Sequence, residues 1–313
     1  MTYQYLFGPV PSRRLGASLG IDLVPLKTCS YNCIYCECGR TTDLTLERRE
    51  YVPTAGVIDE LRRFLGGAPA LDFITCAGSG EPTLHSGIGE IIRFLKHEFP
   101  AYRVAVLTNG SLLSDPAVRE EIMPADLVIP TLNAVSEEAF RRICRPYPDL
   151  TAAGVNAGIR QFAADYSGAL WLEVFIVPGI NDSDEEIDRI DAEIRAIAPD
   201  KVQLNTLDRP GAVPWVTPAD DDALDRIAGR ITGAPVEIVG RLPSRATMAA
   251  FHDEVVGFIM TLVRRRPATV MDISRATGLH TNEVNKYIQY LLEEGEITVK
   301  KEERGSFFLP RKG

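Results

Sequence analysis

The sequence predicts an α/β protein built on a mostly parallel sheet, followed by a smaller C-terminal domain. Apolar segments of strand length alternate with amphipathic segments of helix length from Ala17 to Asn205. This alternation is typical of a parallel sheet with helices outside it. A chain of 313 residues is also long enough for one large and one small domain. The pattern leaves open whether the sheet closes into an eight-stranded barrel or stays an open arc of six strands.

Six strands and six helices are expected in this first region. The strands, which are rich in apolar residues, are Ala17–Val24, Leu71–Cys76, Arg103–Thr108, Leu127–Leu132, Ala169–Ile176 and Lys201–Asn205. The helices begin near Thr54, Ile88, Asp115, Ser136, Ala152 and Asp182. Ser136 and Asp182 have side chains of the kind that caps a helix N-terminus. Because parallel strands end on one face, we expect the chemistry on the face where Cys29, Gly78, Asn109, Asn133 and Pro178 lie.

The pattern changes after about Pro210. The expected elements are a helix over Thr217–Thr232, a strand over Val236–Val239, a long helix over Thr247–Arg266, a short helix ending at Gly278, a helix from Thr281 to Gly295, and a hairpin of Ile297–Lys301 with Ser306–Leu309. Helix, turn, helix and a two-stranded wing are typical of a winged-helix module. We therefore expect one domain over residues 1–245 and a helical linker with a winged helix over 246–313.

Composition excludes several classes of protein. The chain is 45% hydrophobic and 25% charged, and its apolar runs fall far short of the roughly 20 residues that a membrane helix needs. No basic stretch followed by an apolar block opens the sequence, so we expect a cytoplasmic protein that does not associate with membranes. The net charge of −9 argues against a protein that coats nucleic acid. Residues 251–313 hold ten Lys and Arg against nine Asp and Glu, which gives duplex DNA binding little electrostatic support.

The six cysteines indicate a metal centre. Four of them lie within ten residues, at Cys29, Cys33, Cys36 and Cys38. Clustered thiols in a long cytosolic chain favour metal binding over disulfides. The spacing C-x3-C-x2-C places three thiolates in one short loop, where they can hold three irons of an iron–sulfur cube. Such a cube ordinarily has four ligands, so one iron would keep open coordination sites for a substrate or cofactor. Structural zinc with Cys38 as a fourth ligand is the alternative, although Cys36-Glu37-Cys38 is tight for a tetrahedral site.

A second motif strengthens the iron–sulfur interpretation. Gly78-Ser79-Gly80-Glu81-Pro82 follows the second expected strand. Glycines allow close approach of the backbone to a ligand, and a carboxylate suits an ammonium group. Together with the cysteine loop, this turn resembles the radical S-adenosylmethionine (radical SAM) enzymes over roughly residues 15–210. The resemblance implies a partial barrel of six strands, a [4Fe–4S] cluster bound by Cys29, Cys33 and Cys36, and SAM held by Gly78, Gly80 and Glu81.

The resemblance also implies cofactor contacts for residues at the other strand ends. Asn109 ends the third strand, where related enzymes contact the ribose or carboxylate of SAM, and Asn181 follows the fifth strand, near the adenine. Gln203 and Asn205, two apart on the sixth strand, are placed to reach cofactor or substrate. Tyr35, directly before the third cysteine, is counted with these cofactor-binding residues.

The opening of the chain narrows the resemblance. Phe7–Asp22 followed by Lys27-Thr28-Cys29 is similar to the branch described as wyosine-base-related iron–sulfur oxidoreductases. An Asp is usual in that branch where Asn133 stands, so substrate choice is expected to differ here.

The resemblance implies an enzyme with an oxygen-sensitive cluster. A small electron donor, flavodoxin or ferredoxin, would reduce the cluster, and cleavage of SAM would give methionine and a 5′-deoxyadenosyl radical that abstracts hydrogen from an unidentified substrate, with a tRNA or nucleoside as one candidate. Two other interpretations stay open: modification of a peptide or protein, including activation of a glycyl-radical partner, and an iron–sulfur redox regulator that binds DNA. The winged helix would dock a macromolecular substrate or serve packing alone.

Several residues near the predicted site have no assigned role. Cys38 is expected to line the cluster loop, Cys76 to lie near the SAM turn, and Cys144 to act as a small apolar residue. Glu173 interrupts an apolar strand, so it needs either a buried partner or a ligand. Arg14 is expected either on a surface loop or in contact with an anionic substrate or an electron donor.

Overall fold

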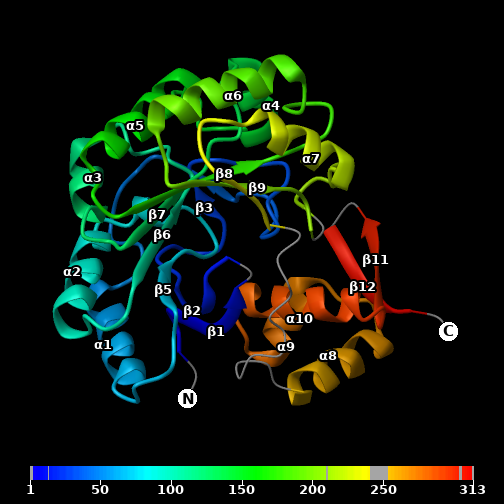
Figure 1. The fold of residues 1–313 in the computed structure, drawn as a ribbon. Helices are drawn as coiled ribbons and strands as arrows, with labels where there is room; N and C mark the ends of the chain where they lie inside the picture. Colours follow the sequence, from blue (N-terminus) through cyan, green and yellow to red (C-terminus); the bar gives the residue numbers. More distant parts are fainter. Residues whose placement is uncertain (1–2, 13, 209–210, 240–252, 303–304, 312–313) are drawn as a thin grey trace.

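The computed structural model describes residues 3–12, 14–208, 211–239, 253–302 and 305–311, and within them one curved sheet dominates (Figure 1). Its strands run in the order β1 (Leu6–Ser12), β2 (Gly16–Ile21), β5 (Phe73–Cys76), β6 (Val104–Thr108), β7 (Leu127–Pro130), β8 (Ala169–Phe175), β9 (Lys201–Asn205) and β10 (Val236–Ile238). All neighbouring pairs are parallel except β1 with β2. Because β1 and β10 are the two edges, the described strands form an open arc, and each of the six predicted strands is present.

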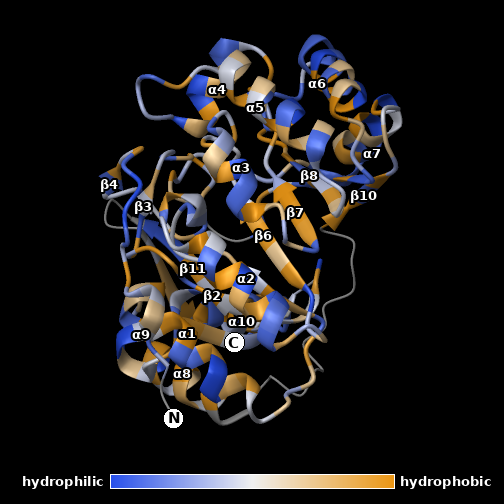
Figure 2. Ribbon diagram, turned by 90° about the vertical axis from the view of Figure 1, so that its left-hand side faces the viewer, coloured by the Kyte–Doolittle hydropathy of each residue, from blue (hydrophilic) through white to orange (hydrophobic). Residues whose placement is uncertain are grey.

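Helices cover the outer face of this arc. They are α1 (Thr54–Leu65), α2 (Ile88–Glu98), α3 (Pro116–Ile122), α4 (Glu137–Cys144), α5 (Ala152–Asp165), α6 (Asp184–Ile197) and α7 (Asp221–Arg230). Figure 2 shows the hydrophobic strands β6 and β7 beneath helices whose outer residues are hydrophilic. Side chains alternate across a strand, so Leu19, Ile21 and Cys76 join the large apolar core under the helices. Ser18, Gly20 and Thr75 therefore face the inside of the arc.

The helix starts follow side-chain capping. Ser136 accepts a hydrogen bond from the backbone N–H of Ala139 and caps α4, as predicted. The predicted cap at Asp182 is wrong by one residue, because Ser183 caps α6 while Asp182 accepts from the backbone N–H of Gly179. Likewise α7 begins at Asp221, not near Thr217, because the Asp220 side chain accepts from the backbone N–H of Ala223.

The C-terminal part has its own core. It consists of α8 (Asp253–Arg265), α9 (Val270–Thr277), α10 (Thr281–Glu293), β11 (Ile297–Glu302) and β12 (Gly305–Pro310), in the order expected from the sequence. Ile259, Val263, Ile288 and Phe308 are buried together in this unit. The predicted boundary at 245/246 and the predicted helix start at Thr247 lie outside the described residues.

Two short strands and one short helix complete the description. β3 (Thr28–Cys29) pairs with β4 (Asp43–Leu44), and η1 (Pro82–Leu84) is a single turn of 3-10 helix after β5. None of the helices described here is long and apolar enough to cross a membrane.

Asp191 joins α6 to the turn before β10. Its carboxylate accepts from the Arg195 guanidinium at 2.7 Å and from the backbone N–H groups of Thr232 and Gly233 at 2.7 and 2.8 Å. Although burial alone would raise its pKa, these hydrogen bonds hold the pKa of Asp191 below its usual value. The carboxylate therefore stabilises the fold above the unfolded-state pKa, and this contribution is lost as pH falls through the folded-state pKa.

We predict that Asp191→Asn lowers the free energy of unfolding at pH 7 by about 1–3 kcal/mol, the cost of a disrupted buried hydrogen-bond set. Urea denaturation at several pH values measures this, and the difference from wild type should shrink below about pH 4. Asp149→Asn is the control, because Asp149 is exposed. An effect of Asp191→Asn that does not change with pH would contradict the ionised role.

Candidate active site

Backbone hydrogen bonds hold the cysteine loop at the C-terminal end of α4. The backbone N–H of Ile34 donates to the carbonyl of Ile143 at 3.0 Å, and that of Asn32 donates to the carbonyl of Cys144 at 3.0 Å. Ile34 is fully buried and acts as an apolar anchor for the loop. The loop is therefore held at the carboxyl end of the sheet, where strand ends and glycine turns converge.

Each of the three motif thiols has its own environment. Cys29 Sγ accepts from the Asn109 side-chain amide at 3.6 Å, and burial raises its pKa to about 12. The Cys33 thiol forms a hydrogen bond with the Cys144 thiol, and this bond together with burial raises the pKa of Cys33. Cys36 Sγ accepts from Lys27 Nζ at 3.0 Å. A hydrogen bond from Cys38 and the Lys27 ammonium lower the pKa of Cys36 to about 5, against the effect of burial.

These thiols suit a cluster better than a single ion. Within the described residues, no three His, Cys, Asp or Glu side chains converge in the way that one metal ion requires. An iron–sulfur cube presents its irons at separate corners, so its thiolates do not have to meet at one point. Lys27 is only 6% exposed and its ammonium faces the thiols, which suits a buried anionic group. The donor set thus fits the cluster that the sequence predicts.

The three remaining cysteines differ from one another. Cys38 lines the loop, with its Sγ 3.5 Å from Asn282 Oδ1 in α10. Cys76 is fully buried on the helix side of β5, so it faces away from the thiols. Cys144 contacts the Cys33 thiol and lies 3.8 Å from the Asn133 amide. Cys144 is therefore part of the site, a placement that the sequence analysis did not predict.

The Gly78–Glu81 turn packs directly on the start of the cysteine loop. Lys27 N–H donates to the Ser79 carbonyl at 3.0 Å, and Glu81 N–H donates to the Thr28 carbonyl at 3.2 Å. A Cβ on Gly80 would lie 1.8 Å from the Thr28 carbonyl oxygen, and one on Gly78 would lie 2.2 Å from Asp22 Oδ1. In this structure the glycines are thus required by contacts within the protein itself, in addition to the expected contact with a ligand.

Glu81 is buried and heavily hydrogen-bonded. Its Oε1 accepts from Thr83 N–H and from the hydroxyls of Thr83 and Thr108, and its Oε2 accepts from Asn109 N–H at 2.7 Å. Burial raises the pKa of this carboxyl group, while the four hydrogen bonds oppose the shift. Since a carboxylate offers about four lone-pair positions, two at each oxygen, Oε2 keeps one for a further donor. The carboxylate both ties the strand ends together and retains capacity for an ammonium group.

Asn109 and Tyr35 lie beside the thiols, and their contact with a cofactor stays a prediction. The Asn109 amide donates to Ser30 Oγ at 2.8 Å as well as to Cys29. The Tyr35 ring stacks on Phe175 with centroids 3.9 Å apart, and its hydroxyl accepts from the Asn133 amide at 2.7 Å. Tyr35 therefore links the cysteine loop to the ends of β7 and β8.

The fifth and sixth predicted strands carry the other expected contacts. Asn181 is fully buried and uses its amide on the backbone of Val177, Asn133 and Phe175, so it holds a turn, and its contact with a cofactor stays a prediction. Gln203 is fully buried too, and its Oε1 has no hydrogen-bond partner among the described residues. An orphaned acceptor of this kind indicates a place for a ligand or a water.

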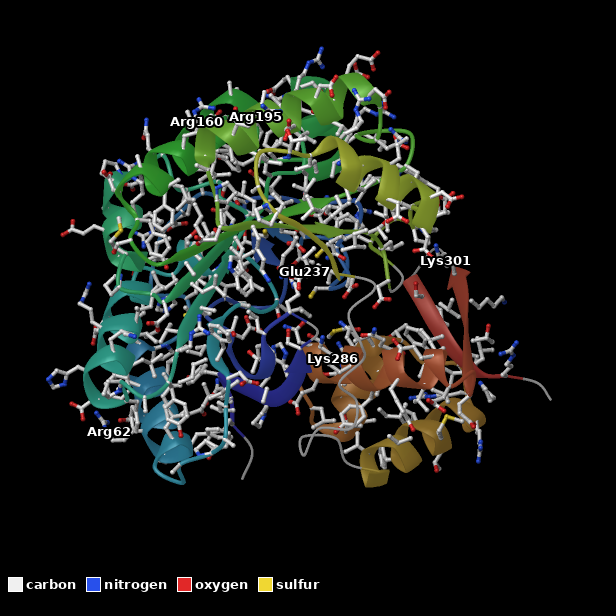
Figure 3. The ribbon with its side chains drawn as sticks, viewed as in Figure 1. Arg62, Arg160, Arg195, Glu237, Lys286 and Lys301 are labelled. Carbon is white, nitrogen blue, oxygen red and sulfur yellow. The ribbon has the colours of Figure 1, made fainter. Side chains whose placement is uncertain are left out.

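A polar network crosses the inside of the arc. Glu173 accepts from Arg14 at 2.8 Å, from the Asn205 amide at 2.9 Å and from the Thr131 hydroxyl at 3.3 Å. The partner of Glu173 is therefore Arg14, from the hairpin between β1 and β2, and both side chains are partly buried. Figure 3 labels Glu237 on the same inner side, where it accepts from Gln203 at 3.1 Å.

Comparisons with known proteins agree with this geometry. Residues 23–190 match the family model described as the radical SAM superfamily. A UPF0026 protein of Methanocaldococcus jannaschii is 30% identical over 96% of this chain and 94% of its own length. A protein of Brachyspira hyodysenteriae named GTPase Obg is 35% identical over 93% of this chain, but the match spans only 43% of that protein.

Solved structures share the fold at low identity. A radical SAM methyltransferase from Sphaerobacter thermophilus superposes with a TM-score of 0.54, at 20% identity over 71% of this chain and 65% of that one. Streptococcus suis SuiB bound to the precursor peptide SuiA gives a TM-score of 0.54, at 12% identity over 72% of this chain and 50% of that one. These two likenesses establish the architecture of the sheet and its helices.

We predict that Gly80→Ala destabilises the protein strongly, because the new methyl group collides with backbone that cannot rotate away. Thermal unfolding measures the loss, and a midpoint shift of several degrees is expected. Gly229→Ala is the matched control. Gly229 lies in α7 with nothing within 4 Å of a new Cβ, so this change should be neutral or slightly stabilising. Equal effects of the two substitutions would contradict the packing argument.

Proposed function

This chain belongs to the radical SAM superfamily and to the UPF0026 proteins, and from that premise we propose that it cleaves S-adenosylmethionine reductively at a [4Fe–4S] cluster. Cys29, Cys33 and Cys36 would bind the cluster. The resulting 5′-deoxyadenosyl radical would abstract hydrogen from an organic substrate. The observation that carries this proposal is the direct backbone packing of the Gly78–Glu81 turn on the residues that precede the first cysteine.

The chain's own residues would bind, orient and shield the reacting groups. When bound, the cluster supplies the electron that breaks the sulfonium bond of SAM. Lys27 offers a buried ammonium beside the Cys36 thiol, which suits the negative charge of a thiolate-bound cluster. Glu81 Oε2 and the carbonyls of its turn are available for the SAM ammonium. Gln203 Oε1 has no hydrogen-bond partner among the described residues and would accept from another polar group inside the arc.

The C-terminal unit is proposed to be a winged helix that packs on the barrel. Three helices followed by the β11–β12 hairpin support this description. The polar side of α10, which a DNA-binding winged helix would turn outward to the major groove, lies against the barrel instead. An enzyme is therefore favoured over a DNA-binding regulator. Flavodoxin or ferredoxin as the electron donor, a cytoplasmic location and the wyosine-related branch are parts of the same proposal.

The test is anaerobic reconstitution followed by incubation with SAM and dithionite. The proposal requires about four iron and four sulfide per chain and the release of 5′-deoxyadenosine. A colourless zinc protein, or an iron–sulfur protein that releases no 5′-deoxyadenosine, would refute it.

Two cysteine variants sharpen that test. We predict that Cys36→Ala loses most of the iron and all cleavage of SAM, because one ligand of the cluster is removed. Cys38→Ala is the matched control two residues away. It should keep the cluster, because Cys38 contacts Asn282 of α10 and is not proposed as an iron ligand. The visible spectrum and the iron content of both variants decide between three ligands and four. Equal bleaching of the two variants would show that Cys38 is a ligand.

A further prediction concerns Glu81. Glu81→Gln places an amide donor among four hydrogen-bond donors, so the free energy of unfolding should fall by about 1–3 kcal/mol. In protein that retains its cluster, loss of charge should also weaken SAM binding by about tenfold or more. Titration of SAM against the paramagnetic resonance of the reduced cluster measures the affinity. The control is Glu120→Gln, which changes an exposed carboxylate on α3. Unchanged SAM affinity in cluster-replete Glu81→Gln would limit Glu81 to its structural role.

A further inference from the structure

Lys27 is a buried cation in a backbone conformation that lysine rarely adopts. Its φ is 63°, in the left-handed region that few residues other than Gly, Asn and Asp occupy. The residue is only 6% exposed. Both features act against a lysine at this position, since the left-handed backbone favours glycine and burial favours an uncharged side chain. Neither local backbone preference nor solvation therefore explains the side chain.

The turn that contains Lys27 is of a kind in which glycine is the usual residue. The Pro25 carbonyl accepts from the backbone N–H of Thr28 at 3.0 Å, which makes Lys27 the third residue of a β-turn. A positive φ at that position favours Gly or Asn. The backbone is held from outside the turn as well, because Lys27 N–H donates to the Ser79 carbonyl and its carbonyl accepts from Thr42 N–H, both at 3.0 Å. A strained residue that its surroundings hold in place is typical of functional sites.

The Lys27 ammonium faces the cysteine loop. Its Nζ donates to Cys36 Sγ at 3.0 Å. The acidic groups that act most strongly on its charge are the thiols of Cys36, Cys38 and Cys29. No Asp or Glu in the described part of the chain forms an ion pair with it. A cation buried without a carboxylate needs another anion beside it, and thiolates that carry an iron–sulfur cluster are such an anion.

We propose that Lys27 raises the reduction potential of the cluster by stabilising the negative charge that reduction adds. The presence of the cluster rests on the proposed function. Reduction transfers one electron to the cluster and neither forms nor breaks a bond, so the cluster with its thiolates becomes more negative. An ammonium fixed 3.0 Å from Cys36 Sγ stabilises this reduced state more than the oxidised state. Lys27 acts through the Cys36 thiolate and is not itself an iron ligand.

The same residue joins the two halves of the candidate active site. Its backbone N–H binds the Ser79 carbonyl in the glycine turn, and its side chain binds the Cys36 thiol. The backbone contact fixes where the ammonium lies relative to the thiols, which explains why a lysine in a strained conformation serves here. A higher potential lets the cluster accept its electron from a weaker one-electron reductant. Contact of the ammonium with the carboxylate of SAM is the alternative role.

Redox titration of the full-length, anaerobically reconstituted protein tests the proposal in the absence of SAM. Dithionite supplies the electron, and the paramagnetic resonance of the reduced cluster reports the fraction reduced at each potential. Lys27→Met removes the charge with little change in length, and it should lower the midpoint potential. Loss of a charge-assisted hydrogen bond should lower the equilibrium constant for reduction about tenfold or more, a shift of about 60 mV or more for a one-electron couple.

Two further variants of Lys27 and one control assign the shift to charge. Lys27→Gln keeps a hydrogen-bond donor without the charge and should resemble Lys27→Met, whereas Lys27→Arg keeps the charge and should recover part of the lost potential. Lys300→Met is the control, because it removes a positive charge from an exposed position on β11, where water and salt screen it. A potential of Lys27→Met equal to that of wild type, or an equal shift in Lys300→Met, would overturn the proposal.

Iron content distinguishes an electrostatic role from a purely structural one. If Lys27→Met and Lys27→Gln both lose the cluster while Lys27→Arg keeps it, the positive charge is needed to hold the anionic cluster, which supports the proposal. Loss of the cluster from Lys27→Arg as well would show that the shape of the side chain supports the loop, against the proposal.

SAM binding and cleavage, assayed in parallel, separate this inference from the proposed function. A lower potential in Lys27→Met, in a protein that releases no 5′-deoxyadenosine, refutes the proposed function alone. Release of 5′-deoxyadenosine by wild type with an unchanged potential in Lys27→Met refutes the role of Lys27 alone. Weaker SAM binding without a shift in potential would assign the ammonium to the SAM carboxylate, against the proposal. A chain that takes up no iron refutes both.

Discussion

The contact between the Gly78–Glu81 turn and the Lys27–Thr28 backbone is the constraint on which the rest of the site depends. Two reciprocal backbone hydrogen bonds join these segments, and they approach so closely that a Cβ on Gly80 has no room. The cysteine loop starts directly after Thr28, so its position is fixed by the end of β5. Glu81 continues the same linkage to β6 through Thr108 and Asn109.

The two faces of the sheet have different roles: the outer face stabilises the fold, and the inner face carries the polar side chains. The outer face is a continuous apolar core under the helices, which supplies the burial that a fold of this size needs. The inner face carries charged and amide side chains that find partners across the arc, as Glu173 does with Arg14 and Asn205. Burying such groups is costly unless they are paired, so the interior keeps its polar character through a network. Gln203 Oε1, which has no hydrogen-bond partner in the described part of the chain, is a gap in that network.

The C-terminal unit completes the interior. Its α10 is anchored by Asp22, which also binds the Ser79 hydroxyl, so displacement of the helix would disturb the glycine turn. This arrangement turns the polar face of α10 toward the sheet.

The sequence by itself determined the order of the elements and predicted the chemistry of the cysteine loop. Apolar periodicity located the six parallel strands, and the spacing of Cys29, Cys33 and Cys36 indicated a cluster, because both signals are local in the chain. Tertiary structure alone decided that β1 and β10 extend the sheet, that Cys76 faces the helices, that Cys144 meets Cys33, and that Arg14 pairs with Glu173. It also decided that Asn285 faces the barrel. These contacts join residues far apart in sequence, and no local pattern records which face of a helix or strand will meet a distant partner.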